Sequence, residues 1–250
     1  MASLVFDIGN TRTKAAVMSG GEVLEVLVTD CLEQIDIERL CRKYAVDRAI
    51  ASVVGATPDF ERLLPKPLFE RFHLLSYRSK LPIKIDYETP HTLGMDRVAA
   101  VVGARELCGS GPLVVVDAGS CITIDLLDDA DCYRGGAILP GIAMRFKAMH
   151  EYTAALPLVT LTPAEREGEE KTPLTGRTTR ASMVSGVCNA AVFEIQGFVK
   201  QYEGEFPNVK VFLTGGDAVF FAKRLFFPNF ATPSLMYIGL ESILNMNVLS

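Results

Sequence analysis

One short motif occurs twice in this chain, once near the N-terminus and once in the middle. The first copy runs from Leu4 to Lys14 and the second from Val114 to Thr123. Each copy is an apolar run that ends in Asp-x-Gly and a small polar residue, followed by more strand-like sequence. A β-branched run ending in Asp and Gly suits a buried strand that turns tightly into a hairpin. Because the motif recurs together with its flanking strands and the following hairpin, we expect two related halves.

The residues of this turn also suit a phosphate. Gly lets the backbone approach a ligand closely. Backbone N–H groups and a nearby hydroxyl or amide can cradle phosphate oxygens, and an Asp can hold a cation through its carboxylate. Two such turns facing each other would form a nucleotide site between the halves, which favours phosphoryl transfer. The structural alternative is that each Asp only caps a tight turn and that Lys14 is a solvated lysine at a strand edge.

Hydropathy along the chain predicts mixed strands and helices, and therefore an α/β fold. The repeat divides the 250 residues into halves at 1–112 and 113–250, and the 49% of hydrophobic residues is enough for a core in each half. Gly20-Gly21 separates two strand-like runs, as in a hairpin. A short helix is predicted within 58–67 and a mobile loop at 165–171. The predicted strands are 14–18, 23–28, 48–54, 74–77, 113–116, 122–127, 133–138 and 209–213, and the predicted helices are 35–44, 95–107, 142–150, 180–202 and 237–246.

Composition argues against several classes of protein. The net charge of −5, without a clustered basic stretch, disfavours a nucleic-acid-binding surface. The six cysteines include no Cys-x-x-Cys pair and there are only three histidines, so the spacing of a zinc site is absent. Scattered thiols are typical of a reducing compartment. No apolar run in the sequence approaches a membrane span of ~20 residues, and we expect a cytoplasmic protein.

The segment Gly94-Met95-Asp96-Arg97 begins the helix predicted between the two copies of the motif. Its acid and base together favour a site in which Asp96 accepts a proton from a substrate hydroxyl and Arg97 binds a carboxylate with its forked guanidinium. An ordinary low-pKa Asp suffices in phosphoryl transfer, because a loose transition state needs little early deprotonation. The structural alternative is that Asp96 complements the helix dipole and Arg97 pairs with a surface carboxylate.

Three further segments are less specific. Gly135–Gly141 is interpreted as close packing where a strand meets a helix. Thr178 or Thr179 is a candidate N-cap of the long helix, where a hydroxyl could also bond a ligand. The turn Thr214–Asp217 follows a strand suited to an adenine pocket. The sequence contains neither a P-loop nor the motifs of a protein kinase, so the hairpin turns would have to hold any nucleotide.

Taken together, these motifs resemble the type III pantothenate kinases, members of the acetate and sugar kinase/Hsp70/actin superfamily. The resemblance covers nearly the whole chain and rests on the order and spacing of five motifs. They are Asp7-Ile-Gly-Asn-Thr-x-x-Lys14, Gly94-x-Asp96-Arg97, Asp117-x-Gly-Ser120, Gly135-Gly-x-Ile-x-Pro-Gly141, and Thr179 followed by Ser185-Gly186. One departure is Ser120, because the second turn of the family usually reads Asp-x-Gly-Thr. Serine keeps the hydroxyl but lacks the methyl group that restricts χ1.

The resemblance implies two ribonuclease-H-like, actin-like ATPase halves with an ATP cleft between them. It implies transfer of the γ-phosphoryl group of ATP to pantothenate, giving 4′-phosphopantothenate, the first step of coenzyme A synthesis, with Asp96 as proton acceptor. Asp117 would bind a monovalent cation, K⁺ or NH₄⁺, and Asp7 would hold the Mg²⁺ that accompanies ATP, through water. The family is dimeric, with the pantothenate pocket near the subunit interface. The implied ATP contacts are Asp7, Ile8, Gly9, Asn10, Thr11, Arg12, Thr13, Lys14 and Ser120, and the implied pantothenate contacts are Tyr87, Gly94, Met95, Asp96, Arg97 and Thr179.

Two alternatives stay open at this point. One is a non-catalytic regulator of the same fold that binds pantothenate or a nucleotide, and the other is a kinase for a different small acid. The regulator is disfavoured because a protein that only binds need not keep a proton acceptor, Asp96, beside a phosphate cradle.

Overall fold

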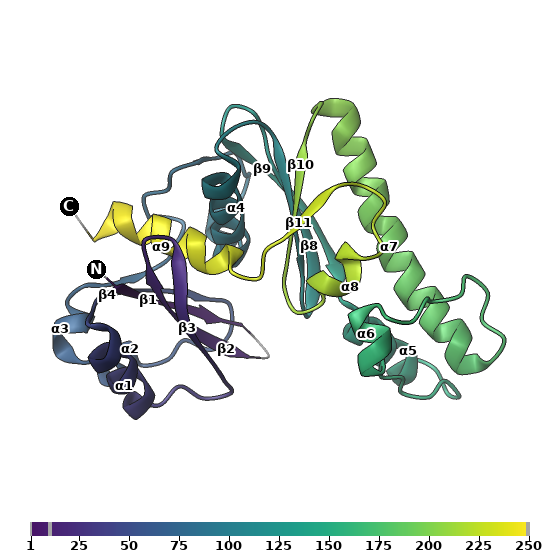
Figure 1. Cartoon of the computed structure of the whole chain (residues 1–250), viewed down its shortest axis with the longest axis horizontal. Coiled ribbons are helices and arrows are strands. Elements are labelled where there is room, and N and C mark those ends of the chain that lie inside the picture. The colour runs from purple at the N-terminus through teal and green to yellow at the C-terminus, as the bar shows by residue number, and fades with distance from the viewer. Residues whose placement is uncertain (1, 10–11, 249–250) are drawn as a thin grey trace. The chain divides into compact units, whose positions relative to one another are not determined.

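The computed structural model of the chain describes residues 2–9 and 12–248 (Figure 1). It divides into two compact units. The first contains the described residues of 1–110, 131–134 and 234–250, and the second contains 111–130 and 135–233. The sequence divides the chain only once, at residue 112, whereas the structure adds two later segments to the first unit. Mixed strands and helices in both units confirm the predicted α/β class.

The first unit is built on a five-stranded sheet with the order β3-β2-β1-β4-β5. Strand β1 runs antiparallel to β2 and parallel to β4, and β5 lies parallel to β4. Gly20 and Gly21 connect β2 to β3 with φ angles of 61° and 85°, which are the positive values that a tight hairpin of this kind requires. The strands are β1 (Ala2–Ile8), β2 (Thr13–Ser19), β3 (Glu22–Thr29), β4 (Val46–Val53) and β5 (Phe72–Leu74).

The two faces of this sheet carry different helices. Leu4, Phe6 and Ile8 point into a hydrophobic core with α1 (Gln34–Tyr44), α2 (Phe60–Leu63) and α3 (Lys66–Phe69), which lie together in Figure 1. Because side chains alternate along a strand, Ser3, Val5 and Asp7 lie on the opposite face. That face packs against α4 (Met95–Cys108) and α9 (Leu235–Asn247).

Helix α9 belongs to the first unit because it packs tightly on α4. A Cβ atom added to Gly103 would collide with the carbonyl of Leu235, and one added to Gly239 would collide with the carbonyl of Ala99. The two glycines therefore let the helix backbones approach closely. On the same sheet face, the Ser3 hydroxyl donates to Glu241 of α9 at 3.1 Å.

The second unit repeats the strand order of the first. Its sheet runs β11-β10-β7-β8-β9, and β6 (Lys84–Ile85) pairs with the first residues of β9. Strand β7 runs antiparallel to β8 and parallel to β10, as β1 does to β2 and β4. This correspondence confirms the two related halves expected from the repeated motif. The strands are β7 (Leu113–Ala118), β8 (Cys121–Leu127), β9 (Cys132–Pro140), β10 (Lys210–Thr214) and β11 (Asn229–Ala231).

The remaining helices of the second unit are α5 (Ile142–Glu151), α6 (Pro163–Glu167), α7 (Thr179–Glu205) and α8 (Ala218–Ala222). Contrary to the expectation from the sequence, α7 is long and apolar enough to meet the length and composition of a membrane span. Half of its apolar stretch is buried, and Met183, Val187 and Val199 pack into the core of the second unit. Buried core helices show the same pattern.

Three local predictions were wrong. The start of the predicted loop 165–171 belongs to α6, which is fixed by a capping box between Thr162 and Glu165 and by a 2.8 Å ion pair from Glu165 to Arg180. The segment 58–67 holds α2 and the first two residues of a second short helix, α3, because Leu64 is extended before Pro65. Strand β5 ends at Leu74 instead of spanning 74–77.

Candidate functional site

The first Asp-x-Gly turn follows β1 directly. The Gly9 N–H donates to the carbonyl of Arg12 at 3.1 Å, so the chain doubles back between β1 and β2. The predicted ATP contacts Asn10 and Thr11 lie outside the described residues. In the sheet, Asp7 is in register with Lys14 on β2 and with Ser52 on β4, so these three side chains form a row across one face.

Within this row, an ion pair joins Lys14 and Asp7. The Lys14 Nζ atom lies 3.5 Å from Asp7 Oδ2, and the Lys14 side chain is 37% exposed. Burial raises the pKa of Asp7 above its ordinary value, the Lys14 ammonium lowers it, and the charge of Asp96 raises it further. Burial, and secondarily the Asp7 carboxylate, also raises the pKa of Tyr237 on α9 to about 12. Asp96 and Tyr237 therefore both lie within electrostatic reach of Asp7.

Asp96 is held at the start of α4. Gly94 is the N-cap of this helix, and Asp96 Oδ1 accepts a hydrogen bond from the Arg97 N–H at 2.9 Å. A Cβ atom on Gly94 would lie only 2.6 Å from this same oxygen, so glycine leaves the space that the carboxylate occupies. Arg97 is buried, with 7% of its surface exposed. Tyr87 is half-buried, with its ring centroid 6.3 Å from that of Tyr133.

The second Asp-x-Gly turn follows β7 and has different neighbours. Asp117 is in register with Thr123 on β8 and with Thr214 on β10. The Gly119 N–H donates to the Cys121 carbonyl at 2.8 Å, which closes the turn. Thr123 Oγ1 is buried and has no hydrogen-bond partner among the described residues. A buried hydroxyl without a partner is costly, so this oxygen is available for a ligand.

Two other turns, each containing a glycine, pack tightly against the Asp117 turn. Gly215 has a φ of +89°, and a Cβ atom there would collide with Asp117 Oδ1 and the Ala118 carbonyl. The Asp217 N–H donates to that carbonyl at 2.9 Å. From the other side, a Cβ atom on Gly141 would lie 2.6 Å from the Ser120 carbonyl oxygen. The close-packing role predicted for Gly141 is confirmed, whereas the approach of Gly215 to Asp117 was not predicted.

The start of α7 settles which threonine caps the helix. Thr178 is the N-cap, and its hydroxyl accepts a hydrogen bond from the Ala181 N–H at 3.1 Å. Thr179 is the first helical residue and is exposed. Ser185 donates to the Leu174 carbonyl at 2.6 Å, so the chain before the helix folds back along its first turns.

The predicted site residues therefore divide between the two units. The first unit holds the Asp7–Lys14 turn, Tyr87 and 94–97, while the second holds Asp117, Ser120 and Thr179. Throughout 2–9 and 12–248, no cluster of three or more His, Cys, Asp or Glu side chains is placed to bind a metal ion. A cation at Asp117 would consequently rely on hydroxyl, carbonyl or water oxygens for its other ligands.

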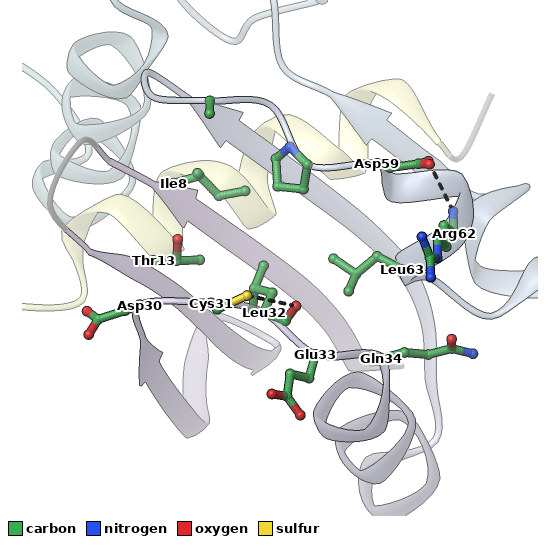
Figure 2. A pocket seen from close by; sticks show the side chains of 12 residues that line it. Ile8, Thr13, Asp30, Cys31, Leu32, Glu33, Gln34, Asp59, Arg62 and Leu63 are labelled. Carbon is green, nitrogen blue, oxygen red and sulfur yellow. Dashed lines mark hydrogen bonds between the residues drawn. The ribbon is translucent and has the colours of Figure 1, made fainter.

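The first unit also contains a cavity of about 510 Å³ on the core side of its sheet (Figure 2). Ile8 and Thr13 are the only predicted ATP contacts, among those that the structure describes, that line it. Its rim carries Asp30, Glu33 and Arg62. Asp7 lies on the other face of the sheet, so this cavity is separate from the row of Lys14, Asp7 and Ser52.

Comparison with known proteins identifies relatives over the whole chain. Residues 3–201 match the family model of type III pantothenate kinase. The chain is 39% identical to the type III pantothenate kinase of Cytophaga hutchinsonii, over 98% of this chain and 100% of that protein. Among solved structures, it is similar to a conserved putative Baf family transcriptional activator from Campylobacter jejuni (TM-score 0.59, 22% identity, 97% of each chain). It is also similar to a putative N-acetylmannosamine kinase from Listeria monocytogenes (TM-score 0.54, 11% identity, 98% of each chain). At these identities the two structures bear on the fold alone.

Proposed function

Because the chain belongs to the type III pantothenate kinase family, it phosphorylates pantothenate with ATP in coenzyme A biosynthesis, and we propose that Asp96 is the proton acceptor. The observation that supports this role is the Gly94–Asp96 arrangement. Gly94 leaves room for the carboxylate at the start of α4, and Asp96 lies within electrostatic reach of the phosphate turn at Asp7. A loose transition state lets such a carboxylate accept the hydroxyl proton late in the transfer.

The first turn is proposed to hold the phosphates of ATP. Lys14 is half-exposed, and its 3.5 Å contact with Asp7 is long for an ion pair. A phosphate group would therefore compete effectively for this ammonium. The γ-phosphoryl group would then pass directly to the pantothenate hydroxyl. Arg97 would hold the substrate carboxylate with its forked donors, with Tyr87, Met95 and Thr179 as further contacts.

The residues of the first turn also fit a magnesium ion that arrives with ATP. Asp7 supplies a carboxylate that is 19% exposed, and Mg²⁺ in phosphoryl-transfer sites binds through one or two carboxylates and several waters. Magnesium, when bound, neutralises charge that develops on the phosphate oxygens. Asp7 would hold it through water.

The second turn fits a monovalent cation, K⁺ or NH₄⁺. Asp117 supplies the charge, and the Thr123 hydroxyl, which has no partner among residues 2–9 and 12–248, lies opposite it on the neighbouring strand. A bound cation would supply positive charge at the second turn. Thr123, Asp117 and backbone carbonyls would hold it, and Ser120 would contact ATP next to it.

We further propose a cytoplasmic homodimer. The support for this proposal is the family to which the chain belongs. The oligomeric state is measured directly by light scattering in solution.

The experiment that tests the proposal is a coupled ATP-consumption assay with pantothenate, Mg²⁺ and K⁺. We expect turnover that falls when K⁺ is replaced by Na⁺, and we expect Asp117→Ala to lose this response. Absence of turnover with both cations present would overturn the activity and favour a protein that only binds. An Asp117→Ala enzyme with unchanged K⁺ dependence would place the cation elsewhere.

A further inference from the structure

Ser52 is a buried residue at the end of β4 whose hydroxyl is not satisfied. It is 1% exposed, and its Oγ atom has no hydrogen-bond partner in the part of the chain that the structure describes. Buried hydroxyls normally have a hydrogen-bond partner, because a buried hydroxyl without a hydrogen bond lowers the stability of the protein. A valine or alanine would fill this position in a strand without that cost. The hydroxyl therefore points to a role that appears only when a ligand is bound.

The neighbours of Ser52 identify that role. Its parallel register with Asp7 places both side chains on the same sheet face, next to each other. Lys14 lies on the other side of Asp7, completing the row Lys14–Asp7–Ser52. The helices that cover this face, α4 and α9, contribute Asp96 and Tyr237, both of which interact electrostatically with Asp7. Asp7 is thus the central group, and Ser52 is the hydroxyl donor beside it.

The Lys14–Asp7 contact shows why Asp7 needs a second donor. At 3.5 Å it is looser than the 2.8 Å pair between Arg39 and Glu25 in the same unit. If Lys14 binds the phosphates of ATP, as proposed above, Asp7 loses its cationic partner. A magnesium ion held through water, as proposed above, would restore positive charge but would leave the buried carboxylate without a direct donor from the protein, which costs free energy unless another donor replaces Lys14.

We propose that Ser52 is a positioning residue for Asp7 in the nucleotide complex. When ATP draws Lys14 away, the Ser52 hydroxyl donates its hydrogen to the Asp7 carboxylate and keeps it directed at the phosphate turn. This inference rests on the proposed binding of ATP phosphates at the first turn. It assigns to Ser52 no contact with pantothenate and no proton transfer.

The test compares two serine-to-alanine variants on the same sheet face. Ser3 is also fully buried, but its hydroxyl is already bonded to Glu241. We expect Ser52→Ala to raise the Tm of the ligand-free protein by about 2 °C, because it removes an unsatisfied hydroxyl. The same variant should raise the KM for Mg·ATP about tenfold, with kcat and the KM for pantothenate changed less than about threefold. Ser3→Ala should lower the Tm and leave the KM for Mg·ATP unchanged.

A second measurement keeps this inference separate from the activity itself. Calorimetric titration of Mg·ATP without pantothenate should show the same tenfold weakening in Ser52→Ala, and Ser52→Thr should restore most of the affinity because it keeps the donor. Unchanged nucleotide affinity in Ser52→Ala would overturn the role of Ser52. A lower Tm with unchanged affinity would show a purely structural hydroxyl. Normal nucleotide binding without turnover of pantothenate by the unaltered protein would instead contradict the proposed function.

Discussion

The two Asp-x-Gly turns occupy the same place in two related sheets but have different neighbours. Asp7 has Lys14 on the antiparallel strand and Ser52 on the parallel strand. Asp117 has Thr123 and Thr214 at the corresponding positions. The first turn therefore carries its own cation, while the second offers a hydroxyl at the position where the first has a lysine.

This difference suggests why a kinase of this kind would need an added cation at one turn only. A carboxylate at a strand end near phosphates requires positive charge in its neighbourhood. In the first unit the Lys14 ammonium supplies it, at 3.5 Å from Asp7. In the second unit, the corresponding position holds Thr123, whose Oγ1 atom is buried without a hydrogen-bond partner among the described residues, and the proposed cation would bind there. The proposed roles of the two turns therefore depend on one difference on the neighbouring antiparallel strand, Lys14 against Thr123.

The largest effect is expected from replacing Asp96, the proposed catalytic base, which has no counterpart among the proposed site residues of the second unit. Replacing Asp96 with Asn should lower kcat by about 10³-fold, because a general base contributes on the order of 10² to 10⁴. Mg·ATP should still bind, since Asp96 is outside the phosphate turn. Single-turnover kinetics and calorimetry measure the two quantities.

A matched control for this variant is Asp59→Asn. Asp59 caps α2, and its side chain accepts a hydrogen bond from the Arg62 N–H, a role that Asn can also fill. We expect its kcat to stay within about twofold of the unaltered protein. If Asp96→Asn retained a near-normal kcat, the base would have to be sought elsewhere, and the assignment of the acid–base role to α4 would fail.

The second prediction concerns a variant in which the lysine of the first turn is replaced by the threonine found at the same position of the second turn. Lys14→Thr removes the built-in ammonium and should lower kcat/KM for ATP by about 10²-fold, since hydrogen bonds to charged groups are among the strongest in proteins. High concentrations of NH₄⁺ should recover part of this loss, because the small cation can enter the space that the lysine left. Recovery is measured against added tetramethylammonium, which is too large to enter. Equal activity with both salts would contradict the idea that Lys14 does the work of a bound cation.

Much of the fold is predictable from local pattern. Apolar alternation locates the strands of both halves, and the Gly20-Gly21 pair identifies the first hairpin. The helix α6 was missed because its residues are mostly charged, although Thr162 and Glu165 form a capping box that the sequence displays. The packing of α9 in the first unit could not be predicted from local sequence. It depends on Gly103 and Gly239, which are far apart in the chain and which each leave room for the opposing helix.

Only part of the candidate site is predictable from the sequence. Asp7, Asp96 and Asp117 stand in recognisable motifs, whereas Ser52 and Thr123 do not. Their importance depends on strand register, which places each opposite an Asp. Register cannot be counted reliably along the sequence, because the first turn is one residue longer than the second. Burial without a hydrogen-bond partner, the property that distinguishes both hydroxyls among the described residues, exists only in three dimensions.

The smallest expected effect isolates the Thr123 hydroxyl, the residue on which the comparison between the turns depends most. Thr123→Val has nearly the same shape and lacks only the oxygen, so we expect the K⁺ concentration for half-maximal activity to rise about tenfold, with kcat at saturating K⁺ little changed. Thr123→Ser keeps the oxygen and should behave as the unaltered protein. Because Oγ1 has no partner in the described part of the chain, the valine variant should also be at least as stable without ligands. An unchanged K⁺ response in Thr123→Val would mean that the hydroxyl is not a ligand, and the proposed cation site at the second turn would lose its support.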